Sequence, residues 1–157
     1  MNYETTCEIE IRIAQYFDYV KYVIVPNVSH GFYQFSNREL DLMLLNSSDY
    51  AYEVEIKVSR QDLIKDKKKR HNHNSQLLRK LWFAIPEKLE KDIDLIPEKA
   101  GILIVNKTGN VKEIRKPKIN NQARKLTEKE KFKLARLGAM RIWKLKAKLI
   151  YKEREIK

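Results

Sequence analysis

Asp41, Glu55 and Lys57 place two carboxylates and one ammonium in two short apolar runs, 40–45 and 51–58. Alternate side chains of a β-strand point to the same face, so Glu55 and Lys57 are expected side by side on a strand. A polar segment typical of a hairpin turn separates the two runs. If the runs pair, Asp41 and Glu55 converge.

Such a set is suited to metal-assisted hydrolysis of a phosphodiester. Mg²⁺ prefers oxygen ligands, and it lowers the pKa of bound water so that the water becomes a nucleophile near neutral pH. A lysine on the same face can orient that water or stabilise charge that develops on the phosphate. We therefore expect Asp41 and Glu55 to bind Mg²⁺, for which Mn²⁺ could substitute, with Lys57 beside the water.

The arrangement resembles the PD-(D/E)XK nuclease superfamily, with Asp41 as the first acid of its motif, Glu55 as the second and Lys57 as the lysine. A proline occurs at Pro26, well upstream of Asp41, so the adjacent Pro-Asp pair is absent. The resemblance implies that these three residues are catalytic. It also implies that the backbone carbonyl of Ile56 is a further metal ligand.

Many members of that superfamily carry a further glutamate on the first helix, and this chain offers two candidates. Apolar residues follow Glu10 at the spacings that share a helix face, so Glu10 borders an apolar stripe. Glu8 has fewer apolar neighbours at those spacings. We favour Glu10 as the catalytic helix acid and keep Glu8 as the alternative.

The order of segments also resembles the compact MmcB-type DNA-repair and phage-encoded branch of the superfamily. Residues 53–63, 82–86 and 96–103 support this, and with the first helix they span about residues 4–116. The resemblance implies an α/β fold with a restriction-endonuclease-like core of helix, three-stranded meander, helix and strand. It implies a metal-dependent DNA endonuclease in DNA repair or phage DNA metabolism. A non-catalytic nucleic-acid-binding module on the same fold and a metal-dependent RNase remain alternatives.

Apolar periodicity and turn residues predict the elements of this core. A second helix is expected to begin at Ser59, because Asp62 three residues later completes a capping-box signature. This helix is expected to continue to Lys80 with an interruption near 72–74. The other predicted elements are a helix at 6–22, strands at 23–28, 40–45, 51–58 and 81–85, and a hairpin of 101–106 with 111–115.

Beyond the core we expect a linker at about 116–126 and a basic C-terminal helix at about 127–152, all within one domain, 1–157. Thr127 with Glu130 forms another capping-box signature. An apolar stripe follows helical spacing, which most often indicates core packing. The stripe consists of Phe132, Ala135, Ala139, Ile142, Trp143, Lys146 and Leu149.

The chain has 33 Lys and Arg against 21 Asp and Glu, a net charge of +12. An excess of this size favours polyanions, so DNA is the expected partner and RNA the alternative. Two basic clusters are candidates for phosphate contact. They are Lys65, Lys67, Lys68, Lys69 and Arg70 in the middle of the chain, and Lys133, Arg136 and Arg141 in the C-terminal helix.

At 157 residues the chain has the length of one domain with a sizeable core. Its single cysteine, Cys7, excludes an intramolecular disulfide. The first residues lack a basic-then-apolar leader, and no apolar run reaches membrane-spanning length, so a cytoplasmic location without membrane association is expected. A homodimer is compatible with these features.

Overall fold

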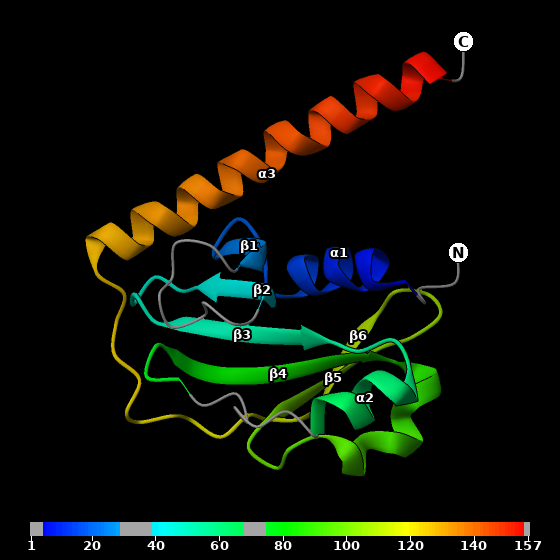
Figure 1. The fold of residues 1–157 in the computed structure, drawn as a ribbon. Coiled ribbons are helices and arrows are strands. Elements are labelled where there is room, and N and C mark those ends of the chain that lie inside the picture. The colour runs from blue at the N-terminus through cyan, green and yellow to red at the C-terminus, as the bar shows by residue number, and fades with distance from the viewer. Residues whose placement is uncertain (1–4, 29–38, 68–74, 156–157) are drawn as a thin grey trace.

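The computed structural model describes residues 5–28, 39–67 and 75–155, which form a mixed α/β fold (Figure 1). The order of elements is helix, three strands, helix and strand, followed by a short helix, a hairpin and a long helix. The elements are α1 (Thr6–Tyr16), β1 (Val23–Val28), β2 (Leu40–Leu45), β3 (Ala51–Ile56), α2 (Arg60–Lys67), β4 (Leu78–Pro86), the 3₁₀ helix η2 (Glu87–Leu95), β5 (Gly101–Val105), β6 (Val111–Arg115) and α3 (Glu128–Glu155).

The strands form one six-stranded sheet in sequence order, β1 to β6. β1, β2 and β3 are antiparallel neighbours, as are β5 and β6, whereas β3, β4 and β5 run parallel. The parallel connections pass through α2 and η2, because a parallel pair needs a crossover. Every residue of β3 is buried, so the centre of the sheet is covered on both faces.

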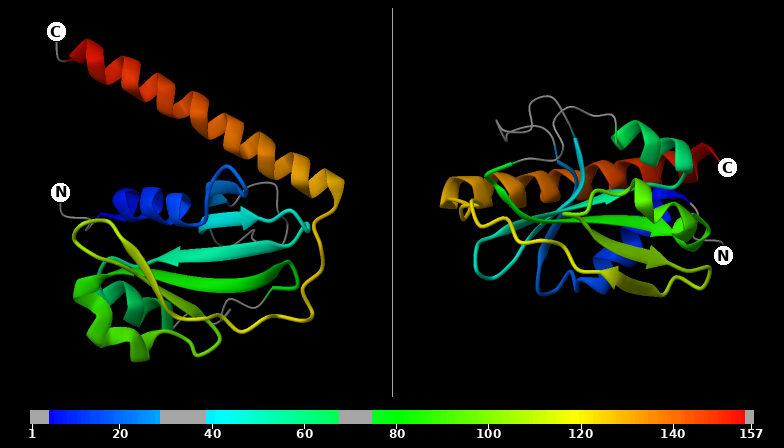
Figure 2. Two further views of the ribbon diagram at one scale, coloured as in Figure 1. Left: turned by 180° about the vertical axis from the view of Figure 1, so that it is seen from behind. Right: turned by 90° about the horizontal axis from the view of Figure 1, so that it is seen from below.

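Helices cover the two faces of the sheet differently (Figure 2). On one face, Ile9 and Ile13 of α1 pack in a cluster with Val54 and Trp82. The alternate residues of the same strands, such as Leu81 and Phe83, face the other side of the sheet, where α2 and η2 lie over β4 and β5. On that second side α3 packs against β1. The core is thus two apolar layers separated by the sheet.

The first helix is shorter than the predicted range 6–22, since α1 ends at Tyr16. Residues 17–22 form turns, and Asp18 adopts a positive φ of 62°. Phe17, the C-cap residue, donates its N–H to the Ile13 carbonyl at 3.0 Å, and its ring centroid lies 5.2 Å from that of Trp82. The helix therefore ends at the left-handed backbone of Asp18, beyond which Tyr19 and Val20 are exposed.

The second helix begins as predicted. Ser59 Oγ donates to Asp62 Oδ2 at 2.7 Å, and the Asp62 N–H donates to Ser59 Oγ at 3.2 Å. The predicted continuation to Lys80 is wrong at its end, because β4 begins at Leu78 and pairs with the start of β3. The predicted interruption at 72–74 lies outside the described residues.

The segment predicted as a linker, 116–126, connects β6 to α3 without regular structure, but it is attached to the sheet along its length. The Asn120 N–H donates to the Arg79 carbonyl at 2.9 Å, and the Arg124 N–H donates to the Gln76 carbonyl at 2.8 Å. Leu126 is 4% exposed. Backbone hydrogen bonds, which composition does not reveal, thus fix the start of α3.

α3 begins as predicted, with the Thr127 N–H donating to Glu130 Oε2 at 2.9 Å. The expectation that its apolar stripe is core is wrong. Leu134 of α3 is fully buried on the β1 side of the sheet and Leu137 is partly buried against the same cluster, while Phe132 and Trp143 are 70% and 69% exposed. Periodicity located the stripe correctly but could not show which side of the helix meets the sheet.

Packing of α1 on the sheet gives the first testable prediction. Ile13 is fully buried, whereas Ile11 of the same helix is 53% exposed. Ile13→Ala should lower the free energy of unfolding by about 2–5 kcal/mol, because it leaves a cavity, and Ile11→Ala by less than about 1 kcal/mol. Urea denaturation of the two variants measures this difference. Equal losses would contradict the described packing of α1.

Candidate active site

Asp41 and Glu55 lie at the same end of the β2–β3 pair. The register pairs Leu42 with Val54, and one further step places Asp41 opposite Glu55 on the same face. Asp41 Oδ2 accepts the N–H of Ile56 at 2.7 Å. This hydrogen bond fixes the Asp41 carboxylate at the end of β3.

Lys57 is the centre of the cluster. Its Nζ lies 2.6 Å from Glu55 Oε2, 3.5 Å from Asp66 Oδ1 and 3.9 Å from Asp41 Oδ2. The side chains of Glu55, Asp66 and Lys57 are 4%, 3% and 10% exposed, and that of Asp41 is 29% exposed. The structure therefore brings the three predicted motif residues together, and Asp41 is the most accessible of them.

Asp66 is a member of this cluster that the sequence interpretation missed. It lies on α2, three residues after the buried Leu63, so both side chains share the helix face that meets the sheet. A carboxylate on the buried face of a helix is rarely left without a partner. The sequence contained a signal for this: the capping signature at Ser59 fixes the start of the helix, and the spacing of three residues from Leu63 then places Asp66 on the same face.

The two candidate helix acids have different environments. Glu8 belongs to the cap of α1, where its Oε2 accepts from Thr5 Oγ1 at 2.6 Å. Glu10 is half-buried, and its pKa is raised by burial and then by repulsion from Asp41. Of the two, Glu10 is therefore the acid beside the cluster.

Carboxylates outnumber the cation in this cluster. Glu53, fully buried on the same face of β3, adjoins Glu55. Burial and then the nearness of Glu53 raise the pKa of Glu55 to about 7, although Lys57 acts in the opposite direction. Burial disfavours the charge of Lys57, but Glu55, Asp41 and Asp66 outweigh it and raise the Lys57 pKa. The cluster therefore holds more carboxyl groups than ammonium groups, and burial and mutual repulsion favour the neutral form of Glu55.

The donor set is compatible with Mg²⁺ but not with a metal held by protein ligands alone. Within residues 5–28, 39–67 and 75–155, no group of three or more His, Cys, Asp and Glu side chains is arranged to hold a metal. Mg²⁺ is usually bound by one or two carboxylates, water and substrate phosphate. Asp41 and Glu55 can supply those carboxylates, and the Ile56 backbone lies beside Asp41.

The predicted phosphate-contacting residues fall into several groups. Lys65 and Lys67 lie on α2, while Lys68, Lys69 and Arg70 are outside the described residues. On α3, Lys133 and Arg136 are exposed. Arg141 instead donates from Nη2 to the Asn27 carbonyl at 2.6 Å, so it attaches α3 to β1.

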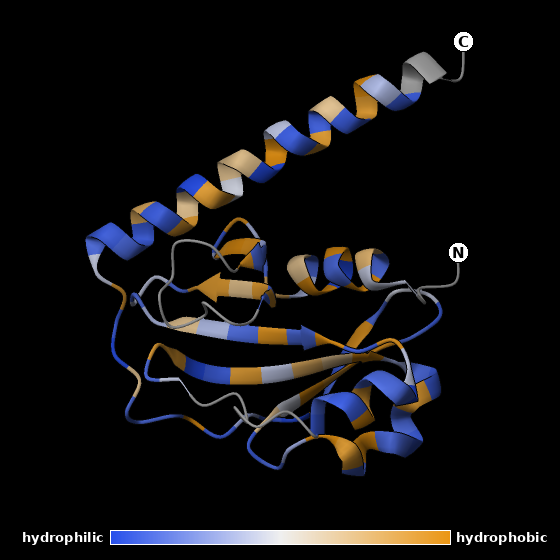
Figure 3. Cartoon of the chain, viewed as in Figure 1, coloured by the Kyte–Doolittle hydropathy of each residue, from blue (hydrophilic) through white to orange (hydrophobic). Residues whose placement is uncertain are grey.

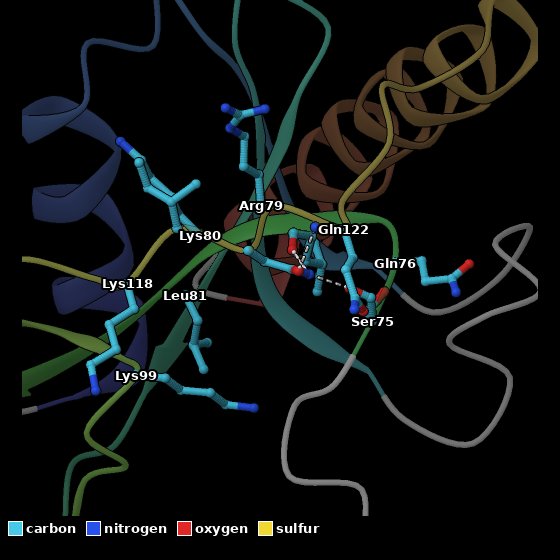
Figure 4. A pocket seen from close by; sticks show the side chains of 11 residues that line it. Ser75, Gln76, Arg79, Lys80, Leu81, Lys99, Lys118 and Gln122 are labelled. Carbon is cyan, nitrogen blue, oxygen red and sulfur yellow. Dashed lines mark hydrogen bonds between the residues drawn. The ribbon is translucent and has the colours of Figure 1, made fainter.

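A basic cleft that the sequence interpretation missed lies at the start of β4 (Figure 4). Its volume is about 530 Å³, and its lining contains four cationic side chains and no carboxylate among the described residues. The cations are Arg79, Lys80, Lys99 and Lys118. They come from three segments, and those of Arg79 and Lys80 point away from that of Lys118 (Figure 4). Such a spread suits an extended polyanion better than one small anion.

The cleft is close to the acidic cluster along the sheet. Leu81 lines the cleft and pairs with Glu53, and Phe83 pairs with Glu55. Two residues of strand correspond to about 7 Å.

Comparison with known proteins shows the family. Residues 2–148 match the family described as DNA repair protein MmcB-like. The chain belongs to the MmcB-like family. A solved structure described as the SPO1766 protein of unknown function from Silicibacter pomeroyi is similar to this MmcB-like chain, with a TM-score of 0.60 and 19% identity over 91% of this chain and 90% of that one. This likeness concerns the fold alone.

No curated protein matches this MmcB-like chain. Among its described helices, none is long and apolar enough to cross a membrane. The name of the family points to a role in DNA repair and hence to DNA as a partner.

The raised pKa of Glu55 gives a pH prediction for this MmcB-like protein. A carboxyl group with a pKa of 4.5 in the unfolded chain and about 7 in the folded protein stabilises the fold most below pH 4.5. This contribution should be lost as the pH rises through 7, by up to about 3 kcal/mol. Glu55→Gln should flatten the fall in unfolding free energy between pH 5 and 8, as measured by urea denaturation.

Glu98→Gln is a matched control, because the Glu98 side chain is 92% exposed. Glu130, whose pKa is lowered to about 2 chiefly by its hydrogen bond to Arg124, titrates below this window. A slope that Glu55→Gln leaves unchanged would show that Glu55 is ionised throughout.

Proposed function

We propose that this MmcB-like protein is a metal-dependent DNA nuclease of the PD-(D/E)XK type that acts in DNA repair. The observation that carries the proposal is the cluster of Lys57 with Asp41 and Glu55 at one end of β2 and β3. The order of helix, three strands, helix and strand supports a restriction-endonuclease-like core. The family's name supports DNA as the substrate.

Each residue of the cluster has a role in this proposal. Asp41 and Glu55 would hold Mg²⁺ together with the Ile56 carbonyl, and Glu10 would complete the acidic surroundings. Bound Mg²⁺, or Mn²⁺ in its place, supplies a nucleophilic water near neutral pH and stabilises charge on the phosphate. Lys57 would orient the attacking water.

Asp66 is a positioning residue in the proposal. It lies 3.5 Å from Lys57 Nζ and is almost fully buried, so it keeps the ammonium at the end of β3. When the Glu55 carboxylate binds a cation, Lys57 retains Asp66 as an anionic neighbour. This second partner allows Lys57 to stay charged beside a metal, because the loss of one ion pair is offset by the other.

A second candidate is a non-catalytic DNA-binding module on the same fold. One observation favours it: Lys57 Nζ already contacts Glu55 Oε2 at 2.6 Å, so the ammonium neutralises a carboxylate that a metal would need. In this alternative the buried cluster stabilises the fold and the basic cleft binds DNA. Metal-dependent cleavage distinguishes the two candidates.

The nuclease proposal predicts a separation of cleavage from binding. Lys57→Ala removes a group that acts on the transition state, so cleavage of supercoiled DNA with Mg²⁺ should fall by about 10²-fold or more, while DNA affinity changes little. Glu55→Gln should abolish metal-dependent cleavage. Plasmid nicking and fluorescence anisotropy on the same preparations measure the two quantities.

Lys91→Ala and Glu90→Gln, at exposed positions remote from the cluster in sequence, serve as controls. Circular dichroism and melting temperature show whether each variant is folded. If folded wild-type protein binds DNA but cleaves no duplex, branched or single-stranded DNA with Mg²⁺ or Mn²⁺, the binding module is correct. Cleavage of RNA alone would identify an RNase.

The basic cleft predicts salt-dependent binding. If its four cations neutralise about three to four phosphates, the slope of log affinity against log salt should have a magnitude of about three to four for duplex DNA. Lys99→Ala with Lys118→Ala should reduce that magnitude by about two. Lys91→Ala with Lys107→Ala removes the same charge elsewhere and should leave the slope nearly unchanged. An equal reduction of the salt slope in both double variants would show that binding depends on net charge alone.

A further inference from the structure

We propose that two copies of this chain associate through α3, which pairs antiparallel with α3 of the second copy along its solvent-facing apolar stripe. The proposal concerns assembly and does not depend on nuclease activity. Figure 3 shows hydrophobic residues recurring along α3, and its C-terminal part rises away from the sheet (Figure 1). Every residue from Ile142 to Lys152 is exposed.

The exposed stripe is extensive. Phe132, Ile142 and Leu149 are 70%, 56% and 61% exposed, and Trp143 beside them is 69% exposed. An apolar row of this kind is uncommon on a monomer and usually marks an interaction surface. At about 100° of rotation per residue, the row is centred about 110° around the helix axis from Leu134, which is fully buried. A partner helix could therefore bind without displacing the sheet.

Six residues of the stripe form a seam with the spacing of a helix pair. They are separated alternately by three and four residues, the a and d pattern of a coiled coil. The seam consists of Phe132, Ala135, Ala139, Ile142, Lys146 and Leu149, without Trp143. The seam is about 26 Å long, since a helix rises 1.5 Å per residue. This regularity is not needed for packing one helix on a sheet.

Side-chain size favours a second copy in the antiparallel direction. In that direction Phe132 meets Leu149 of the second copy and Ala139 meets Ile142, so a small residue faces a large one at the centre. Lys146 meets Ala135, where its stem can pack and its ammonium can reach water. In the parallel direction Lys146 would face Lys146, and Ala139 would face Ala139 across a gap.

The helix dipoles favour the same direction, because antiparallel pairing opposes them. The resulting dimer has twofold symmetry, with the same surface contributed by both copies.

Sedimentation of the full chain tests the assembly. The mass should rise from 18.8 kDa towards twice that value as the concentration increases through the micromolar range. Ile142→Asp and Leu149→Asp should each weaken dimerisation by about 10-fold or more. Met140→Asp on α3, outside the seam, is the matched control and should have little effect. Ala135→Glu should strengthen the dimer, because it faces Lys146.

Disulfide cross-linking tests the direction. In a Cys7→Ser background, which removes the native thiol, mixed Phe132→Cys and Leu149→Cys chains should cross-link, whereas either variant alone should not. Cross-linking of Phe132→Cys with itself would overturn the antiparallel arrangement. A monomer at all concentrations would overturn the proposal. The proposal would also be overturned if Ile142→Asp weakened binding to DNA or to anionic vesicles while the wild-type mass stayed that of a monomer.

Discussion

A buried ammonium surrounded by carboxylates is the interaction on which the candidate site depends. Lys57 contacts Glu55 at 2.6 Å and lies within 4 Å of Asp41 and Asp66. A charge with so little exposure is stable in the fold only when paired, and each partner comes from a different element or position. β2, β3 and α2 must therefore be in place together for the cluster to exist.

The sheet provides this arrangement through its change of strand direction. β2 and β3 are antiparallel, so the start of one lies beside the end of the other, and α2 follows β3 directly as the crossover to β4. The crossover returns Asp66 to the same end of the sheet as Lys57. α1 covers the opposite face and brings Glu10 within electrostatic reach of Asp41.

Charge is separated within this basic chain. The acidic cluster is mostly buried, whereas the cations of the cleft and of α3 lie at the surface. Buried carboxylates repel a phosphate less when a cation neutralises them, and surface cations attract DNA over longer distances. The proposed nuclease uses both regions, and the proposed α3 pairing uses the exposed apolar stripe of α3.

The sequence by itself determined the strands except for the start of β4, the helix caps at Ser59 and Thr127, and the convergence of Asp41 with Glu55 and Lys57, because strand alternation and capping are local rules. Only the tertiary structure decided what depends on contacts between distant segments. Asp66 lies in the cluster because α2 folds back over the sheet. Arg141 hydrogen-bonds to the Asn27 carbonyl, and residues 116–126 hydrogen-bond to β4. Periodicity identified the α3 stripe, but the docking of Leu134 decided that it faces solvent.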